Sequence, residues 1–151
     1  MVEIQRPETY LALIRNSVGS SLWKQMFASV DGHERDIMRN GELSCAFFVS
    51  SILKMCDLVP QLSVTVYGLV KNLETLGWPQ VTAPYAGDIL VWESLVDARG
   101  EKHSHIGFFV GAEQAVSNDS ERGWPQQHHW TFGGNRNIKT IYRPLWESSK
   151  S

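Results

Sequence analysis

The sequence predicts an α+β domain in which N-terminal helices pack on one face of a small antiparallel sheet. Two observations lead to this prediction. In the first part of the chain, apolar residues recur every three or four positions, which is the period of an amphipathic helix. After about residue 80 the period changes to two, which is typical of strands with one buried face. Helices followed by antiparallel strands define the α+β class.

The first predicted helix begins near Pro7, because proline suits the first turn of a helix. Its apolar side chains follow at helical spacing: Leu11, Ile14, Val18 and Leu22. We expect Gly19 to break or bend this run, so that residues 21–27 form a second short helix. Residues 31–41 are polar, contain two glycines and show no period, which predicts a loop.

Two longer helices are predicted next. Ser44 is a favoured N-cap, and positions 48, 52 and 56 then fall on one apolar face, so residues 44–56 are interpreted as one helix. The other helix is expected from about Thr65 to Leu76. Gly77, followed two residues later by Pro79, marks its end.

The second half of the chain contains segments with strand-like alternation, separated by turn residues rich in glycine. The predicted strands are residues 88–92, 105–110, 114–117, 129–132 and 138–142. Turns are expected at residues 97–100, 111–113 and 133–135. No internal repeat or linker interrupts this order, so residues 1–151 are predicted to form a single domain.

Composition excludes several classes of protein. The chain has 151 residues with 14 Lys+Arg and 16 Asp+Glu, a net charge of −2, which does not suit a protein that binds nucleic acid by neutralising phosphates. Six Trp, six Phe and four Tyr argue against intrinsic disorder. We expect no membrane span and no signal peptide, because charged residues interrupt every apolar run. The expected location is the cytoplasm, or outside the cell by a signal-independent route.

Cys45 and Cys56 lie eleven positions apart in one predicted helix. Eleven residues rise by about 16 Å in a helix, beyond the ~7 Å Cα separation that a disulfide allows. Each cysteine therefore needs its own explanation. Cys45 falls in the first turn, where unpaired N–H groups and the helix dipole can lower a thiol pKa. Cys56 lies late in the helix and is interpreted as a structural residue.

Two blocks downstream of Cys45 carry a family resemblance. Residues 84–92 read Pro-Tyr-Ala-Gly-Asp-Ile-Leu-Val-Trp, and residues 103–111 read His-Ser-His-Ile-Gly-Phe-Phe-Val-Gly. Together with a cysteine at a helix start, this pattern resembles the NlpC-type papain-like cysteine peptidases and their CHAP amidase relatives. The resemblance spans about residues 44–118. It implies a papain-like fold, with the nucleophilic cysteine on a helix packed against a small antiparallel sheet and a histidine on the second strand of that sheet.

Residue by residue, the resemblance makes Cys45 the nucleophile and His105 the base, and Gly87-Asp88 the turn into the strand before His105. A polar residue on the next strand should orient the imidazole. The family spacing falls on Ser117, whereas the amide of Asn118 is better suited to accept an imidazole N–H. These two neighbours cannot both face His105, because a strand alternates faces. We expect Asn118 to orient the ring, with Ser117 as the second candidate.

The resemblance further implies thiol-dependent hydrolysis of an amide or peptide bond, with no metal or organic cofactor. The implied partner is a peptide or a peptidoglycan fragment, cut within or next to the stem peptide. A protein deamidase or acyltransferase is an alternative with the same chemistry. A binding module that uses the same cleft without turnover is an alternative from another class. The sequence leaves the oligomeric state and the bond cut open.

The histidines also permit a zinc site. His103 and His105 share one face of a predicted strand, and His128 or His129 could add a third ligand to make a catalytic zinc centre. An HxH pair alone is a weak metal signal, and His128 and His129 point to opposite faces if both lie in a strand. The roles of His103, His128 and His129 stay open at this point.

Overall fold

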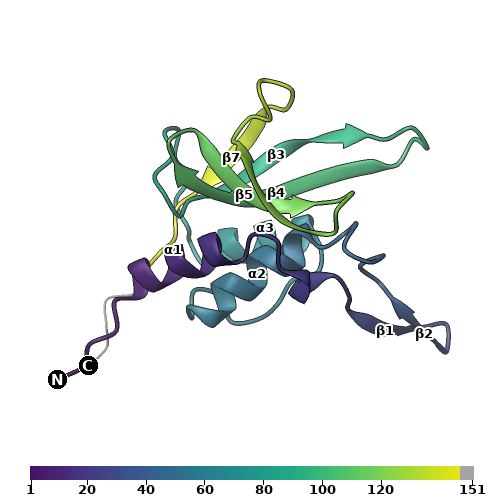
Figure 1. Cartoon of the computed structure of the whole chain (residues 1–151), viewed down its shortest axis with the longest axis horizontal. Coiled ribbons are helices and arrows are strands. Elements are labelled where there is room, and N and C mark those ends of the chain that lie inside the picture. The colour runs from purple at the N-terminus through teal and green to yellow at the C-terminus, as the bar shows by residue number, and fades with distance from the viewer. Residues whose placement is uncertain (147–151) are drawn as a thin grey trace.

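A computed structural model describes residues 1–146 of the chain, and these residues form an α+β fold (Figure 1). The helices are α1 (Arg6–Asn16), α2 (Cys45–Met55) and α3 (Val66–Thr75), with a short 3-10 turn η1 (Ser21–Trp23). The strands are β1 (Phe27–Val30), β2 (His33–Asp36), β3 (Ile89–Val96), β4 (Lys102–Gly111), β5 (Gln114–Asp119), β6 (Trp124–His129) and β7 (Ile138–Tyr142).

The main sheet has five antiparallel strands in the order β6-β5-β4-β3-β7, and β1 and β2 form a separate hairpin. The three α-helices of the described residues lie along one face of the main sheet, as the sequence predicts (Figure 1). Helix α2, whose first residue is Cys45, packs against β4 and β5 in the middle of the sheet. This placement decides where Cys45 lies.

Both faces of the main sheet are apolar. On the helix side, Ile106, Phe108 and Val116 join the core of the helices. On the other side, Leu90, Trp92, Phe109, Ala115 and Ile141 form a second cluster, covered by Trp130 and Phe132 from the segment after β6. Because successive side chains of a strand point to opposite faces, β4 presents Ile106 to the helices and His105 to the second cluster.

Several predicted elements are confirmed. The helix predicted at 65–76 is α3, and the Thr65 hydroxyl accepts the N–H of Gly68 as an N-cap. The helix predicted at 44–56 is α2, but the Ser44 side chain donates to the Trp23 carbonyl oxygen at 2.6 Å and does not cap the helix. Cys45 and Cys56 are both free thiols, as the helix geometry requires.

Three predicted segments are wrong. The loop expected at residues 31–41 is wrong at residues 33–36, which form β2 and pair with β1 around Asp31 and Gly32; these two have positive φ angles of 52° and 79°. Both strands are mostly exposed, so they lack the alternation by which a half-buried strand is recognised. The helix expected at 21–27 is only the turn η1. The strand expected at residues 129–132 lies earlier in the chain: it is β6, which runs from Trp124 to His129.

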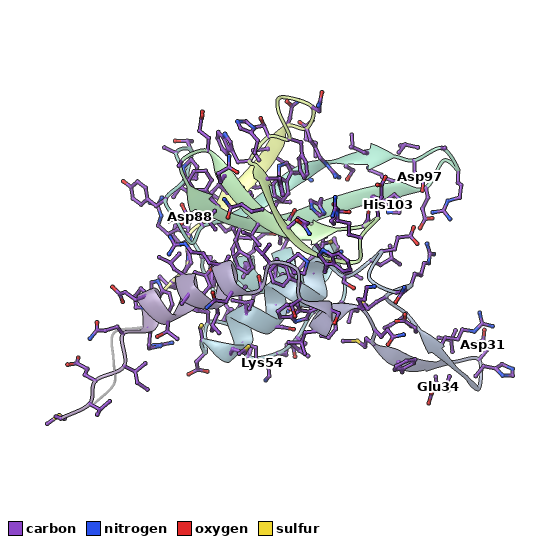
Figure 2. All side chains as sticks on the ribbon, in the orientation of Figure 1. Asp31, Glu34, Lys54, Asp88, Asp97 and His103 are labelled. Atoms are coloured by element: carbon purple, nitrogen blue, oxygen red, sulfur yellow. The ribbon has the colours of Figure 1, made fainter. Side chains whose placement is uncertain are left out.

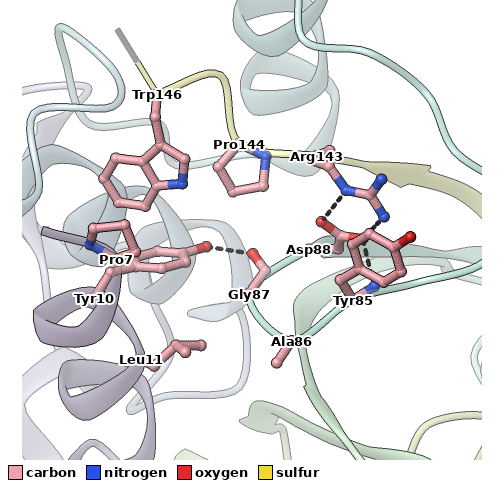
Figure 3. A pocket seen from close by; sticks show the side chains of 10 residues that line it. All are labelled: Pro7, Tyr10, Leu11, Tyr85, Ala86, Gly87, Asp88, Arg143, Pro144 and Trp146. Carbon is pink, nitrogen blue, oxygen red and sulfur yellow. Dashed lines mark hydrogen bonds and ion pairs between the residues drawn. The ribbon is translucent and has the colours of Figure 1, made fainter. Parts of the chain in front are cut away.

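The Gly87-Asp88 pair forms the turn into β3, and contacts from distant parts of the chain hold it (Figure 3). The Tyr10 hydroxyl of α1 donates to the Gly87 carbonyl oxygen at 2.7 Å. Asp88 is 2% exposed, and its carboxylate accepts Arg143 Nη2 at 2.8 Å and the Tyr85 N–H at 2.7 Å. A cavity of about 180 Å³ lies beside this turn and is lined by residues of α1, of the turn and of the segment after β7.

The β1–β2 and β3–β4 hairpins project from the same end of the molecule, while Asp88 lies at the opposite end of the sheet (Figures 1 and 2). One carboxylate closes the base of the β1–β2 hairpin, because Asp36 accepts the N–H groups of Met26, Met38 and Asn40. Arg99, in the β3–β4 turn, reaches Glu42 at 3.2 Å. The segment between the β1–β2 hairpin and Cys45 is thereby tied to the main sheet.

Within residues 1–146, none of the helices combines the length and the apolar character that crossing a bilayer requires.

Candidate active site

Cys45 is the first residue of α2 and is partly buried. Two contacts fix the chain just before it: the Ser44 hydroxyl bonds the Trp23 carbonyl, and the Gly41 carbonyl accepts the Asn118 side-chain amide. Pairing of β4 with β5 runs no farther than Gly107 with Ser117, and the Cys45 sulfur lies beside the next N–H, that of Ile106. The thiol is therefore next to the residue that directly follows His105.

Burial raises the pKa of the Cys45 thiol. The N–H groups of Ile106 and Ala46 and the positive charge of Arg136 oppose this rise without cancelling it. The sequence predicts the opposite direction, because the helix N-terminus favours a thiolate. That prediction is wrong for the resting protein, since removal of the sulfur from water outweighs the helix N–H groups.

His105 lies on β4 opposite Trp92 of β3, with the two rings 5.0 Å apart. Burial lowers the pKa of His105 to about 3, and the charge of Arg136 and the neighbouring His128 add to this effect. At neutral pH the site therefore holds a neutral imidazole and a neutral thiol. The two groups are therefore not an ion pair at neutral pH.

Ser117 orients His105, and Asn118 does not. The Ser117 hydroxyl lies 2.9 Å from His105 Nε2, and its backbone pairs with Gly107, two residues after His105. Asn118 points to the helix side, where its Nδ2 donates to the Gly41 carbonyl oxygen at 2.7 Å. The expectation for Asn118 is wrong, because the register of β5 turns its side chain to the face away from His105. The second candidate of the sequence analysis occupies the position.

The hydrogen-bond chain behind Ser117 has a defined direction. His128 Nδ1 lies 2.7 Å from the His129 carbonyl oxygen, which can only accept, so this nitrogen carries the proton. Burial lowers the pKa of His128, so the neutral ring keeps a bare Nε2 that accepts the Ser117 O–H across 2.6 Å. The Ser117 oxygen then accepts from His105 Nε2–H. By elimination, Nδ1 of His105 is the nitrogen that can take up a proton.

Aromatic rings enclose this chain of polar groups. Phe132 stacks on His128 with ring centres 4.1 Å apart, and Trp92 lies 5.4 Å from Phe132. Phe132 has a φ of 54°, an unusual value for a residue with a side chain. His129 Nδ1 holds this turn by accepting the N–H groups of Thr131 and Gly133. His129 therefore has a structural role, because it helps to place the Phe132 ring, which lies 6.0 Å from that of His105.

Sequence reasoning did not identify Arg136, and it considered His128 only as a possible zinc ligand. His128 reaches the site because β5 pairs with β6, and no local pattern marks β6, whose sequence is Trp-Pro-Gln-Gln-His-His. Arg136 lies in the segment before β7, and its Nε and Nη2 donate to the carbonyl oxygens of Glu93 and His103, each at 3.0 Å. No motif in the sequence connects Arg136 to Cys45. Only the folded chain brings them together.

The three-histidine zinc set does not assemble. His105 and His128 share Ser117, whereas His103 Nε2 pairs with Asp97 at 2.9 Å. Among the described residues, the donors close enough to share an ion are Asp97, Glu101 and His103. Arg99 lies within 3.2 Å of Asp97 and 3.7 Å of Glu101, so a cation already balances these carboxylates.

Comparison with known proteins assigns no family to this site: neither a protein-family model nor a curated protein matches the chain.

Proposed function

We propose that the chain is a cysteine-dependent amide hydrolase in which Cys45 is the nucleophile and His105 is the base. The observation that carries this proposal is the directed chain from His128 through Ser117 to His105, which leaves Nδ1 of His105 free to accept a proton, one residue before the Ile106 N–H that lies beside the Cys45 sulfur. A nucleophile, a base and a group that orients the base are the parts of a catalytic triad. The finer proposal for the fold is a papain-like arrangement, with the thiol at a helix start and the imidazole on a strand.

In the proposed reaction, His105 Nδ1 removes the thiol proton as the Cys45 sulfur attacks the carbonyl carbon. The backbone N–H groups at the start of α2 stabilise the oxyanion of the tetrahedral intermediate. The His105 proton then passes to the leaving amine, the C–N bond breaks, and an acyl thioester remains. A water molecule that gives its proton to His105 attacks the thioester, releases the carboxylic acid and restores the thiol.

Ser117 and His128 act on His105 in this scheme and do not touch the substrate. When His105 gains its second proton, its Nε2–H continues to donate to Ser117, so the imidazolium stays in place. The buried surroundings and the Arg136 charge make this imidazolium a strong acid, since they lower the pKa of His105. The proton therefore passes readily to the leaving amine.

The proposed substrates are peptide amides such as those of peptidoglycan stem peptides, following the family resemblance. The test is mass spectrometry of purified sacculi and of synthetic stem peptides incubated with the unmodified chain, Cys45→Ala and Cys56→Ala. We expect cleavage with the unmodified chain and with Cys56→Ala, and none with Cys45→Ala. Release of ammonia without a shortened product would identify a deamidase.

A binding module that does not turn over substrate is the second candidate, because burial keeps Cys45 a neutral thiol. Alkylation near neutral pH separates the two candidates. In a hydrolase, His105 should make Cys45 react faster than Cys56, whose pKa is also raised by burial. Equal rates at the two cysteines, with no cleavage of any stem peptide, would reject the hydrolase.

A further inference from the structure

Arg136 lies across the two strands that carry the site. Its Nε donates to the carbonyl oxygen of Glu93, and its Nη2 to that of His103, each at 3.0 Å. The pairing of β3 with β4 shifts register between Trp92 and Leu95, and these two carbonyls belong to that irregular stretch. His103 is two residues before His105 on the same strand. Two hydrogen bonds thus fix the guanidinium plane close to the imidazole.

The charge of Arg136 has no counter-ion among the described residues. Arg143 and Arg99 have carboxylates at 2.8 and 3.2 Å, but no carboxylate of residues 1–146 lies within ion-pair distance of Arg136. Its Nη1 also makes no hydrogen bond within these residues. The side chain is partly buried, and burial lowers the pKa of its guanidinium. A partly desolvated cation gains more than an exposed one from an anionic partner.

The charge of Arg136 acts on both proposed reacting groups. It opposes the rise that burial causes in the pKa of Cys45, and it adds to the fall that burial causes in the pKa of His105. The carbonyl group of a substrate must lie between these same two side chains during the reaction. A group attached close to that carbonyl therefore comes within electrostatic reach of Arg136.

We propose that Arg136 binds a carboxylate of the substrate, so that the preferred acyl group carries a negative charge next to the bond that is cut. The statement about substrate depends on the proposed hydrolase; the carboxylate site itself does not. A guanidinium held in one plane, with an unused nitrogen, is well suited to bind a carboxylate. The unpaired positive charge, held on the carbonyl of His103 two residues before His105, is the feature that points to this ligand.

The test compares two alkylating reagents, iodoacetate and iodoacetamide, at Cys45. In both, the thiolate sulfur displaces iodide and forms a bond to the CH₂ carbon, but only iodoacetate carries a carboxylate. We divide the rate with iodoacetate by the rate with iodoacetamide. The fraction of Cys45 present as thiolate is the same in both reactions, so it cancels in this ratio. We expect the ratio at Cys45 to exceed that of N-acetylcysteine about tenfold, as for one charge-assisted contact. Peptide mass spectrometry measures both rates.

In Arg136→Met the ratio should fall to that of N-acetylcysteine, whereas Arg136→Lys should keep part of the preference. Arg99→Met is the matched control, because it removes an arginine of the β3–β4 turn whose partners are Glu42 and Asp97. The control should leave the ratio unchanged. A ratio in the unmodified chain equal to that of N-acetylcysteine, or one that Arg136→Met does not alter, overturns the proposal.

If Arg136→Met does not fold, the salt dependence of the unmodified chain decides the matter. Salt screens charges, so a preference for iodoacetate due to Arg136 must shrink as ionic strength rises. A preference that salt does not change would reject the carboxylate site. A high ratio without hydrolysis of any peptide would keep the carboxylate site and reject the hydrolase. Hydrolysis with a ratio equal to that of N-acetylcysteine would keep the hydrolase and reject the carboxylate site.

Discussion

The Ser117 hydroxyl has one hydrogen and lies between two imidazoles, and this limits the states that the site can adopt. While His128 is neutral, Ser117 donates to it and accepts from His105. If His128 gained a proton, both of its ring nitrogens would donate, and the Ser117 oxygen would accept from both imidazoles through its two lone pairs. The Ser117 hydrogen would then have to turn to another acceptor, so the proton state of His128 sets the direction in which the Ser117 O–H points.

The first prediction concerns Ser117. Ser117→Ala removes the hydroxyl that contacts His105, so kcat for the proposed stem-peptide hydrolysis should fall by roughly 10- to 100-fold, the range for loss of a positioning hydrogen bond. Asn118→Ala is the neighbouring control. It should lower the thermal stability, since its bond to Gly41 is buried, while kcat of the folded protein changes less than about threefold. A larger loss of kcat in Asn118→Ala than in Ser117→Ala would contradict the orientation described here.

At the scale of single elements, Gly107 determines how closely β4, β5 and Trp92 approach one another. A Cβ atom at this position would lie 2.7 Å from Ser117 Cβ and 2.8 Å from the Val116 carbonyl oxygen. These distances are too short for real contacts, and the backbone oxygen cannot move aside alone. The glycine between His105 and Phe109 is therefore a requirement for placing Ser117 against the histidine.

The second prediction follows from this contact. Gly107→Ala should lower the free energy of unfolding by about 1–3 kcal/mol, the usual cost of overpacking, and should also slow hydrolysis because Ser117 shifts. Gly68→Ala is the control, since Gly68 lies in helix α3 and its added Cβ meets only the Thr65 hydroxyl, at 3.0 Å. Denaturant unfolding and peptide hydrolysis measure the two effects. An unchanged free energy of unfolding in Gly107→Ala would show that β4 and β5 can move apart at no cost.

The third prediction concerns the turn into β3. Arg143→Met leaves the Asp88 carboxylate buried without its cation, so the free energy of unfolding should fall by roughly 3–5 kcal/mol. Arg122→Met is the control: Arg122 is exposed and lies 3.9 Å from Asp119, and its loss should cost less than about 1 kcal/mol. Urea titrations followed by tryptophan fluorescence measure both. Similar losses in the two variants would mean that the Asp88 pair is solvated.

At the scale of the whole molecule, the partly buried imidazoles of His105 and His128 couple folding to pH. The pKa of His105 is lowered from 6.5 to about 3 by burial, so the unfolded chain binds more protons than the folded chain between these pH values. Stability from this group is complete above about pH 6.5 and is lost as the pH falls toward 3. The lowered pKa of His128 acts in the same direction.

The fourth prediction is therefore a loss of stability in acid. Lowering the pH from 7 toward 4 should reduce the free energy of unfolding by a few kcal/mol, since each pKa unit corresponds to about 1.4 kcal/mol. His105→Gln should make this dependence shallower, because it removes the group with the larger shift. Denaturant midpoints measured at several pH values test both statements. A midpoint that does not change between pH 7 and 4 would contradict the buried, neutral His105.

The sequence predicts those parts of the molecule whose signals are local. Helix α3 has a cap, an apolar stripe and a glycine stop, and β7 has a clear alternation; both form where expected. The β1–β2 hairpin was missed because exposed strands have no buried face to reveal their period. The choice between Ser117 and Asn118 needed the register of β5. Arg136 and His128 depend on contacts between distant segments, which no single stretch of sequence encodes.

The carboxylate of Asp36 has a consequence for how the protein tolerates change. It closes the base of the β1–β2 hairpin, while the Ser44–Trp23 and Asn118–Gly41 contacts hold the chain between that base and Cys45. The tip of the hairpin, at Asp31 and Gly32, is exposed and lies beyond these hydrogen bonds. Movement at the tip should therefore not displace the segment that holds Cys45. Inserting a short peptide tag at this tip should leave the rest of the molecule undisturbed, which makes the hairpin a convenient handle for labelling.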